Sequence, residues 1–202
     1  MKTKKTKQST RRESTIVSRK RFDEVARRER LNAMLQVHDL EKPLRLAVKL
    51  DEGDWAILRQ IAQEGAITNV GPAARASAIS YLAKSLSVEN LNLLDELAHH
   101  GEDFYVRSQA LIALGSTGLR LAGSTLTKGL AAEERTERLA AEHGLAALGQ
   151  RLGVNALRDL LHADDQRDAL QRIEGMISRR SAEAPRKRRS QRTTTTALRR
   201  EQ

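Results

Sequence analysis

A helical motif that recurs at nearly constant spacing restricts the possible folds of this chain more than any other feature. Leu82, Leu114 and Leu148 stand at the same place in the segments RASAISYLA, DFYVRSQALIALG and AAEHGLAALG, at spacings of 32 and 34 residues. A second amphipathic segment follows each copy, over residues 88–98, 119–130 and 154–161. A helix pair repeated at this interval is typical of an α-solenoid.

The middle copy predicts one helix over residues 103–115. Val106, Ala110 and Leu114 recur at four-residue spacing, which places them on one face of a helix. Asp103 is a suitable N-cap, and Gly115 is suited to end the helix in a left-handed turn.

The same copy carries a resemblance to a known family. It resembles the D-x-x-V-R-x-x-A-x-x-A-L-G consensus of bacterial HEAT-like repeats, also called phycobilisome-lyase-like repeats, at Asp103, Val106, Arg107, Ala110, Ala113, Leu114 and Gly115. The first copy keeps Arg75, Ala78 and Leu82 but has Ala83 for the closing glycine. The third copy keeps Leu148 and Gly149 but has Ala141 in the place of the arginine and Gly144 in the place of the first alanine.

This resemblance covers roughly residues 41–163 and implies an all-α, right-handed HEAT-like solenoid of about four helix pairs. It implies no particular function, because adaptors, lyases and nucleic-acid enzymes all use such repeats. The equivalent arginines, Arg75 and Arg107, are expected to pair with acids of a neighbouring repeat.

The remaining helices are predicted from periodicity and capping residues. They cover residues 22–37, 40–50, 54–65 with Asp54 as N-cap, a helix restarted by Pro72, and a last helix over 164–176. The front of the first helix, ARRER, is so charged that we expect it to project before the helix docks. The repeat domain is therefore predicted over residues 21–178.

The charge is divided unevenly along the chain. Residues 1–30 hold twelve Lys or Arg against four acids, and residues 177–202 hold nine against two, whereas residues 31–176 hold fifteen against twenty. The two basic ends have few apolar residues, and Pro185 discourages helix in the second. We therefore predict disordered basic tails at 1–20 and 179–202 around a mildly acidic body.

The tails carry two basic clusters, Arg19, Lys20 and Arg21 at one end and Arg186, Lys187, Arg188 and Arg189 at the other. Such clusters contact phosphates, an acidic protein or an anionic membrane surface, or they only keep a protein soluble. No aromatic residues are interleaved with them, so nucleic-acid binding through the tails is expected to be weak, nonspecific and salt-sensitive.

The residues offer little support for catalysis. The chain has no Cys, which excludes disulfides, thiolate zinc ligands and a thiol nucleophile. His99 and His100 are adjacent, so they point about 100° apart on a helix and suit a helix C-terminus better than one metal ion. Phosphate-binding and nucleophile-elbow glycine motifs are missing. We therefore expect no catalytic residues, no metal and no cofactor.

The second helix of each pair usually lines the concave side of such a solenoid. Here those helices offer a partner-binding surface of mixed charge, made of Glu89, Asn92, Asp95, Glu96, Arg120, Lys128, Asn155 and Arg158. A nucleic-acid duplex requires a positive stripe, whereas a protein segment accepts such a mosaic. The sequence thus predicts a cytoplasmic, non-catalytic scaffold that binds a protein partner. The alternative is a nonspecific nucleic-acid-associated protein that binds through its tails, and no segment is apolar enough to span a membrane.

Overall fold

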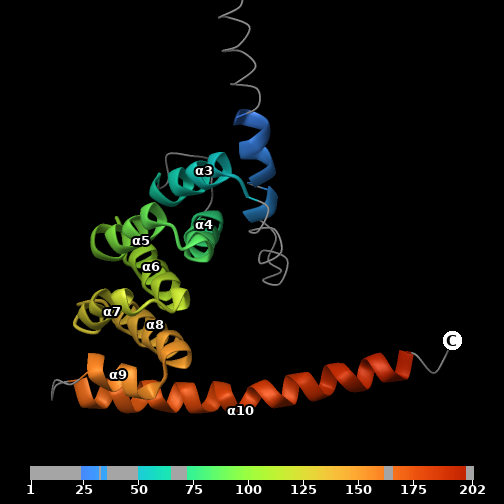
Figure 1. Ribbon diagram of the computed structural model, residues 1–202. Coiled ribbons are helices and arrows are strands. Elements are labelled where there is room, and N and C mark those ends of the chain that lie inside the picture. The colour runs from blue at the N-terminus through green and yellow to red at the C-terminus, as the bar shows by residue number, and fades with distance from the viewer. Residues whose placement is uncertain (1–23, 32, 36–49, 65–71, 162–165, 199–202) are drawn as a thin grey trace, which may run out of the picture. The chain divides into compact units, whose positions relative to one another are not determined.

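The computed structural model describes residues 24–31, 33–35, 50–64, 72–161 and 166–198, with side-chain surroundings up to residue 182. Within these ranges every regular element is a helix, so the predicted all-α class is confirmed (Figure 1). The chain divides into two compact units, Met1–Lys84 and Ser85–Gln202. The helix predicted over residues 40–50, His162 and the basic cluster at residues 19–21 lie outside the described residues.

The first unit contains α3 (Glu52–Gln63) and α4 (Pro72–Ser85), which begins at the predicted proline. Asp51, not Asp54 as predicted, is the N-cap of α3. The Asp51 side chain accepts a hydrogen bond from the Asp54 amide, and the Asp54 carboxylate accepts one from the Asp51 amide. This reciprocal capping box satisfies two backbone donors at once, which a helix starting after Asp54 could not do.

Residues 24–31 and 33–35 are also helical, but the charged front of this segment does not project as predicted. Arg27 contacts Asp51 at 3.0 Å and Asp54 at 3.4 Å, Arg30 also pairs with Asp54, and Arg28 donates to Gln60 at 2.6 Å. Arg27 and Arg30 therefore bind the acidic N-terminal turn of α3, where the carboxylates themselves favour the helix dipole, and Arg28 binds near the C-terminal end of the helix.

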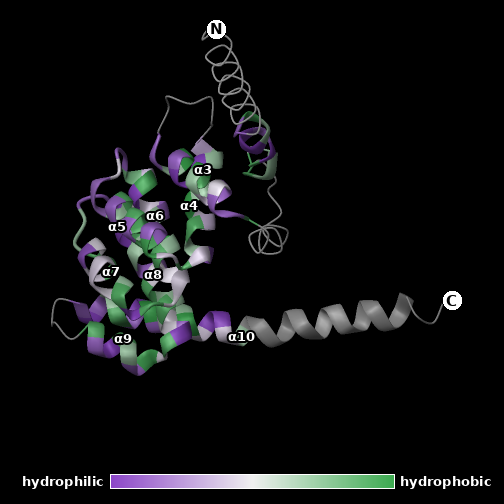
Figure 2. Cartoon of the chain, turned by 45° about the horizontal axis from the view of Figure 1, so that its top comes forward, coloured by the Kyte–Doolittle hydropathy of each residue, from purple (hydrophilic) through white to green (hydrophobic). Residues whose placement is uncertain are grey.

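The second unit has two layers of helices. Its elements are α5 (Val88–His100), α6 (Phe104–Thr117), η1 (Arg120–Ala122), α7 (Gly123–Gly129), α8 (Arg135–Leu152), α9 (Val154–Leu160) and α10 (Arg167–Leu198). Helices α6, α8 and α10 pack in sequence, and α5, α7 and α9 contact one another in the same order. Figure 2 shows hydrophobic residues gathered where α6, α7 and α8 meet.

Leucine and alanine side chains fill the core between these layers. Leu111, Leu114, Leu126, Leu145 and Leu148 are almost completely buried. Aromatic side chains contribute little here, since Phe104 and Tyr105 at the start of α6 are exposed. Small and branched apolar residues thus allow close packing of the helices.

Helix α6 begins as predicted but does not end at Gly115. The Asp103 carboxylate accepts a hydrogen bond from the Val106 amide at 2.8 Å, and the helix continues to Thr117. Its left-handed C-cap is Gly118, with φ of 73°. Gly115 instead lies against the backbone of Gly144 in α8, so closely that a Cβ atom at Gly115 would meet Gly144 atoms at 2.2–2.5 Å.

The third copy of the motif is in a different register from the one predicted. Arg107 donates to the carbonyl of Gly101 at 2.8 Å, and Arg138 donates to the carbonyl of Ala132 at the same distance. Both carbonyls lie six residues before the arginine, just after the preceding helix. Arg138, rather than Ala141, is therefore the counterpart of Arg107, and the spacing is 31 residues.

The second half of α10 also differs from the prediction. The helix passes through Pro185 and ends at Leu198, whereas the sequence predicts an irregular tail from residue 179 (Figure 1). Proline removes one backbone donor, at a cost of about 3 kcal/mol inside a helix. The flanking Ala, Glu, Arg and Lys residues are among the strongest helix formers and favour continuation. The predicted limits of the folded domain, residues 21–178, stay a prediction.

Candidate functional site

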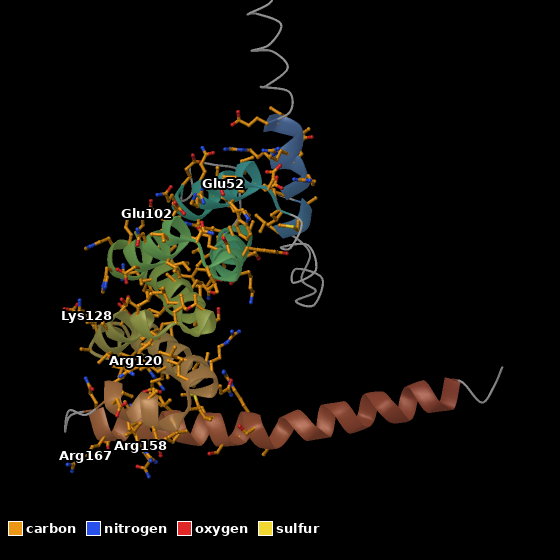
Figure 3. The ribbon with its side chains drawn as sticks, in the orientation of Figure 1. Glu52, Glu102, Arg120, Lys128, Arg158 and Arg167 are labelled. Carbon is orange, nitrogen blue, oxygen red and sulfur yellow. The ribbon has the colours of Figure 1, made fainter. Side chains whose placement is uncertain are left out.

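The predicted surface residues come from neighbouring elements of one layer. All eight are exposed: Glu89, Asn92, Asp95 and Glu96 lie on α5, Arg120 on η1, Lys128 on α7, and Asn155 and Arg158 on α9. Helix α5 contacts α7, and α7 contacts α9. Figure 3 shows Lys128, Arg120 and Arg158 along one side of the unit. We call these eight residues the mosaic surface.

Several charges on the mosaic surface already have partners within the chain. Asp95 accepts a hydrogen bond from the buried hydroxyl of Thr125. Arg120 lies 3.8 Å from the carboxylate of Asp159, and both side chains are well exposed. Such exposed pairs contribute little free energy, so these residues can still turn to a partner.

Arg158 links the mosaic surface to α10. Its Nε atom donates to Glu174 at 2.9 Å. The Lys128 side chain, in contrast, has no hydrogen bond or ion pair with the described part of the chain. Thr125, Asp159 and Glu174 thus hold three of the charges of this surface, and the sequence pattern did not indicate Thr125 or Glu174.

Arg75 and Arg107, which hold the arginine position of the motif, both have structural roles. Arg75 donates to the carbonyls of Ala62 and Gln63 at 2.9 and 3.0 Å, at the end of α3. Arg107 donates in addition to Glu137 of α8, with Nε at 3.0 Å and Nη2 at 2.7 Å. The predicted pairing of Arg107 with an acid farther along the chain is therefore confirmed, and the acid lies on the neighbouring helix α8. This partner, Glu137, lies in the first turn of α8.

A second arginine–glutamate pair joins α8 to α10. Arg172 donates to Oε1 of Glu142 from Nε at 2.9 Å and from Nη2 at 2.6 Å. Hydrogen bonding to Glu137 raises the pKa of Arg107, and hydrogen bonding to Glu142 raises the pKa of Arg172. Both guanidinium groups therefore stay charged throughout the neutral range.

The sequence reasoning missed a polar cleft beside the Arg172–Glu142 pair. It has a volume of about 570 Å³ and lies between the end of α7, the first half of α8 and the start of α10. Its polar lining comprises Thr127, Arg135, Arg138, Glu142, Gln166, Asp168 and Arg172. Leu130, Ala131, Leu139 and Ala169 add apolar walls. We call this space the α7–α8–α10 cleft.

One sequence signal points to these pairs. Asp95 and Thr125, Arg107 and Glu137, and Glu142 and Arg172 are each separated by 30 residues, close to the motif spacing. Complementary groups one repeat apart are placed to meet between successive helices. The 30-residue spacing of complementary groups therefore indicates these three pairs. It does not indicate the cleft, which depends on the distance between α8 and α10.

No group of three or more His, Asp or Glu among the described residues is placed to hold a metal ion. His99 and His100 end α5 as predicted, with ring centroids 6.1 Å apart. No helix in the described ranges is long and apolar enough to cross a bilayer. Comparison with protein-family models and with curated proteins finds no match for the chain.

Proposed function

We propose that the chain is a HEAT-like repeat protein that serves as a non-catalytic scaffold for a protein partner. The observation that carries the proposal is the mosaic surface, where exposed acids, amides and basic groups from α5, η1, α7 and α9 form one layer. Protein interfaces accept mixed charges at their rims, and weakly paired side chains re-pair with a partner at little cost.

The repeat assignment is supported by equivalent contacts at equivalent positions. Arg75, Arg107 and Arg138 are spaced by 32 and 31 residues, and each donates to carbonyls at or just beyond the end of the preceding helix. The alternation of α5 to α10 between two layers is what stacked helix pairs require. We therefore propose a right-handed solenoid of about four pairs.

A protein partner is favoured over a nucleic acid for this surface. Residues 31–176 carry twenty acids against fifteen basic residues, and two arginines of the surface already face carboxylates. A phosphate backbone gains its affinity from unopposed positive charge. The mosaic surface offers little of it.

The test compares the proteins that can be cross-linked to two full-length variants in a cell extract of the source organism. The surface variant carries Glu89→Gln, Glu96→Gln and Lys128→Gln. The control carries Gln109→Lys, His143→Lys and Gln150→Glu in the other layer, on α6 and α8, and both variants raise the net charge by one. We expect proteins cross-linked to the unmodified chain to be lost from the surface variant and kept by the control. If the surface variant keeps them all, the scaffold proposal for this surface is wrong.

Nucleic-acid binding through the basic ends is the second candidate, and one observation favours it. Helix α10 continues to Leu198, so Arg186, Lys187, Arg188 and Arg189 lie on one uninterrupted helix. The side chains of this part are not described. A basic helix follows a phosphate backbone more readily than a flexible chain does, because less conformational entropy is lost on binding.

The discriminating measurement is fluorescence anisotropy of a labelled duplex with the full chain. Binding through the basic helix should weaken by orders of magnitude between about 50 and 200 mM salt if about six phosphates are neutralised. Replacing the four residues at 186–189 by Gln should weaken it markedly, whereas the surface variant should bind as the unmodified chain does. Binding that is equally tight in the Gln variant would exclude this role for α10.

A further inference from the structure

The α7–α8–α10 cleft has the size and lining of a site for a small ligand. Its volume of about 570 Å³ lies within the usual range of such sites. Its wall includes Glu142, which is only 6% exposed and is held in place by Arg172. This part of the cleft wall is therefore formed by a buried carboxylate in a fixed position and not by a solvated side chain.

Not all of the positive charge in the cleft is engaged by the protein. Arg172 uses Nε and Nη2 on Glu142, and Arg138 uses Nη1 on the carbonyls of Ala132 and Glu133. The Arg135 side chain has neither a hydrogen bond nor an ion pair with the described residues. Its guanidinium group therefore offers donors to a ligand.

Thr127 supplies a second, independent indication. Its Oγ1 atom is buried and has no hydrogen-bond partner in the described part of the chain. A buried hydroxyl without a partner is costly and uncommon in a folded protein. Thr127 lines the cleft, so a rotation of its side chain would bring the hydroxyl to an acceptor atom of a ligand bound there and remove this cost.

We propose that the cleft binds a singly charged carboxylate attached to a short aliphatic chain. Three arginines and two acids line it, which leaves one positive charge to be balanced. A carboxylate supplies one negative charge and matches the planar fork of Arg135, with Thr127 as a further donor. The apolar walls at Leu130 and Leu139 suit the aliphatic chain. A phosphate carries nearly two negative charges and would be repelled by Glu142 and Asp168.

This chemistry occurs in two sources, a free aliphatic acid and a glutamate side chain of a peptide. The inference is independent of the mosaic surface, since no residue of that surface lines the cleft. Either proposal can therefore fail without affecting the other.

The experiment is an NMR titration of the isotopically labelled full chain, observing backbone amides and arginine Nε groups. The probes are hexanoate, its neutral counterpart hexanamide, N-acetylglutamate α-amide and inorganic phosphate. We expect saturable shifts at Thr127, Ala131 and Arg135 with hexanoate or the glutamate amide, and binding about tenfold weaker for hexanamide, because a charge-assisted hydrogen bond is lost. Whichever carboxylate binds more tightly identifies the source.

Two variants locate the binding. Arg135→Gln should weaken carboxylate binding about tenfold, whereas Arg151→Gln, an exposed substitution farther along α8, should leave it unchanged. Circular dichroism checks that both variants keep the helical fold. The proposal is overturned if neither carboxylate gives saturable shifts up to about 10 mM, if hexanamide or phosphate binds equally well, or if Arg135→Gln has no effect.

Discussion

Helix α8 contacts α6 on one side and α10 on the other. Each contact contains an arginine–glutamate ion pair, but the surroundings of the two pairs differ. Against α6, Glu137 accepts from an arginine whose side chain is 25% exposed. Against α10, Glu142 accepts from an arginine whose side chain is 57% exposed. The first pair lies in a closely packed interface, whereas the second borders a cleft.

Residue size explains the difference. At the α6–α8 contact, Gly115 and Gly144 allow the two backbones to touch. At the start of the α8–α10 contact, the facing residues are large and polar, including Arg138 and Arg172. Large polar side chains cannot interdigitate without leaving space. An arginine–glutamate pair therefore stabilises a closely packed contact between α6 and α8, whereas a pair of the same kind between α8 and α10 forms part of a candidate binding site.

The largest effect is expected for leucine truncation at the two contacts. Leu114 in α6 is 1% exposed, whereas Leu139 at the cleft is 45% exposed. Leu114→Ala should lower the free energy of unfolding by about 2–5 kcal/mol. Leu139→Ala should change it by about 0.5 kcal/mol or less. Urea unfolding followed by circular dichroism measures both, and similar losses would show that the cleft is as closely packed as the core.

Adding one methyl group at a glycine tests the backbone contact itself. Gly115→Ala places a Cβ atom 2.2 Å from the Gly144 carbonyl oxygen, so the helices must separate at a cost of about 1–3 kcal/mol. Gly175→Ala is the matched control in α10, where nothing lies within 4 Å of the added atom. It should stabilise the helix by up to about 1 kcal/mol. The midpoint temperature of thermal unfolding should therefore fall for Gly115→Ala and rise for Gly175→Ala. An unchanged midpoint for Gly115→Ala would disprove the close approach of the α6 and α8 backbones.

Removing the acid of each ion pair compares their surroundings directly. Glu137→Gln should cost about 1.5–3 kcal/mol, because it leaves the guanidinium of Arg107 in a packed interface with a weaker acceptor. Glu142→Gln should cost roughly half as much, because Arg172 is better hydrated. Denaturant unfolding at low and high salt measures both, and only the second loss should shrink as salt rises. An equal, salt-independent loss would place the two pairs in the same environment.

The helices were predictable because they depend on local signals. Periodicity located α5, α6 and α9, and Asp103 identified the start of α6 from its capping chemistry alone. The errors occurred where a residue had two possible roles. Gly115 suits a helix end, but it serves a contact with a helix that lies 29 residues away in sequence.

The register and the cleft could not be read from local patterns. Leu145 and Leu148 are both buried, so hydrophobicity alone allows either to be the counterpart of Leu114. The contact of Arg138 with the preceding loop decides the choice, and such a contact exists only in three dimensions. The cleft depends on the separation of α8 and α10, which no sequence spacing specifies.

The smallest effect is expected for two threonines that stand two residues apart on α7. Thr125 is buried and donates to Asp95 of α5, whereas the hydroxyl of Thr127 has no partner among the described residues. Thr125→Val should cost about 1 kcal/mol, because it removes a hydrogen bond to a charged group that water only partly replaces. Thr127→Val should change the stability by less than about 0.5 kcal/mol, or raise it, because it removes a buried polar atom that gains nothing.

Valine has nearly the shape and helix propensity of threonine, so the hydroxyl group is the main difference between the two variants. Denaturant unfolding of the ligand-free chain measures both changes under identical conditions. If Thr127→Val is as destabilising as Thr125→Val, the Thr127 hydroxyl has a partner in solution, and the carboxylate site loses one of its two free donors. If Thr127→Val is neutral in stability yet weakens hexanoate binding, the hydroxyl acts on the ligand rather than on the fold. The packed and open sides of α8 would then differ in function as well as in structure.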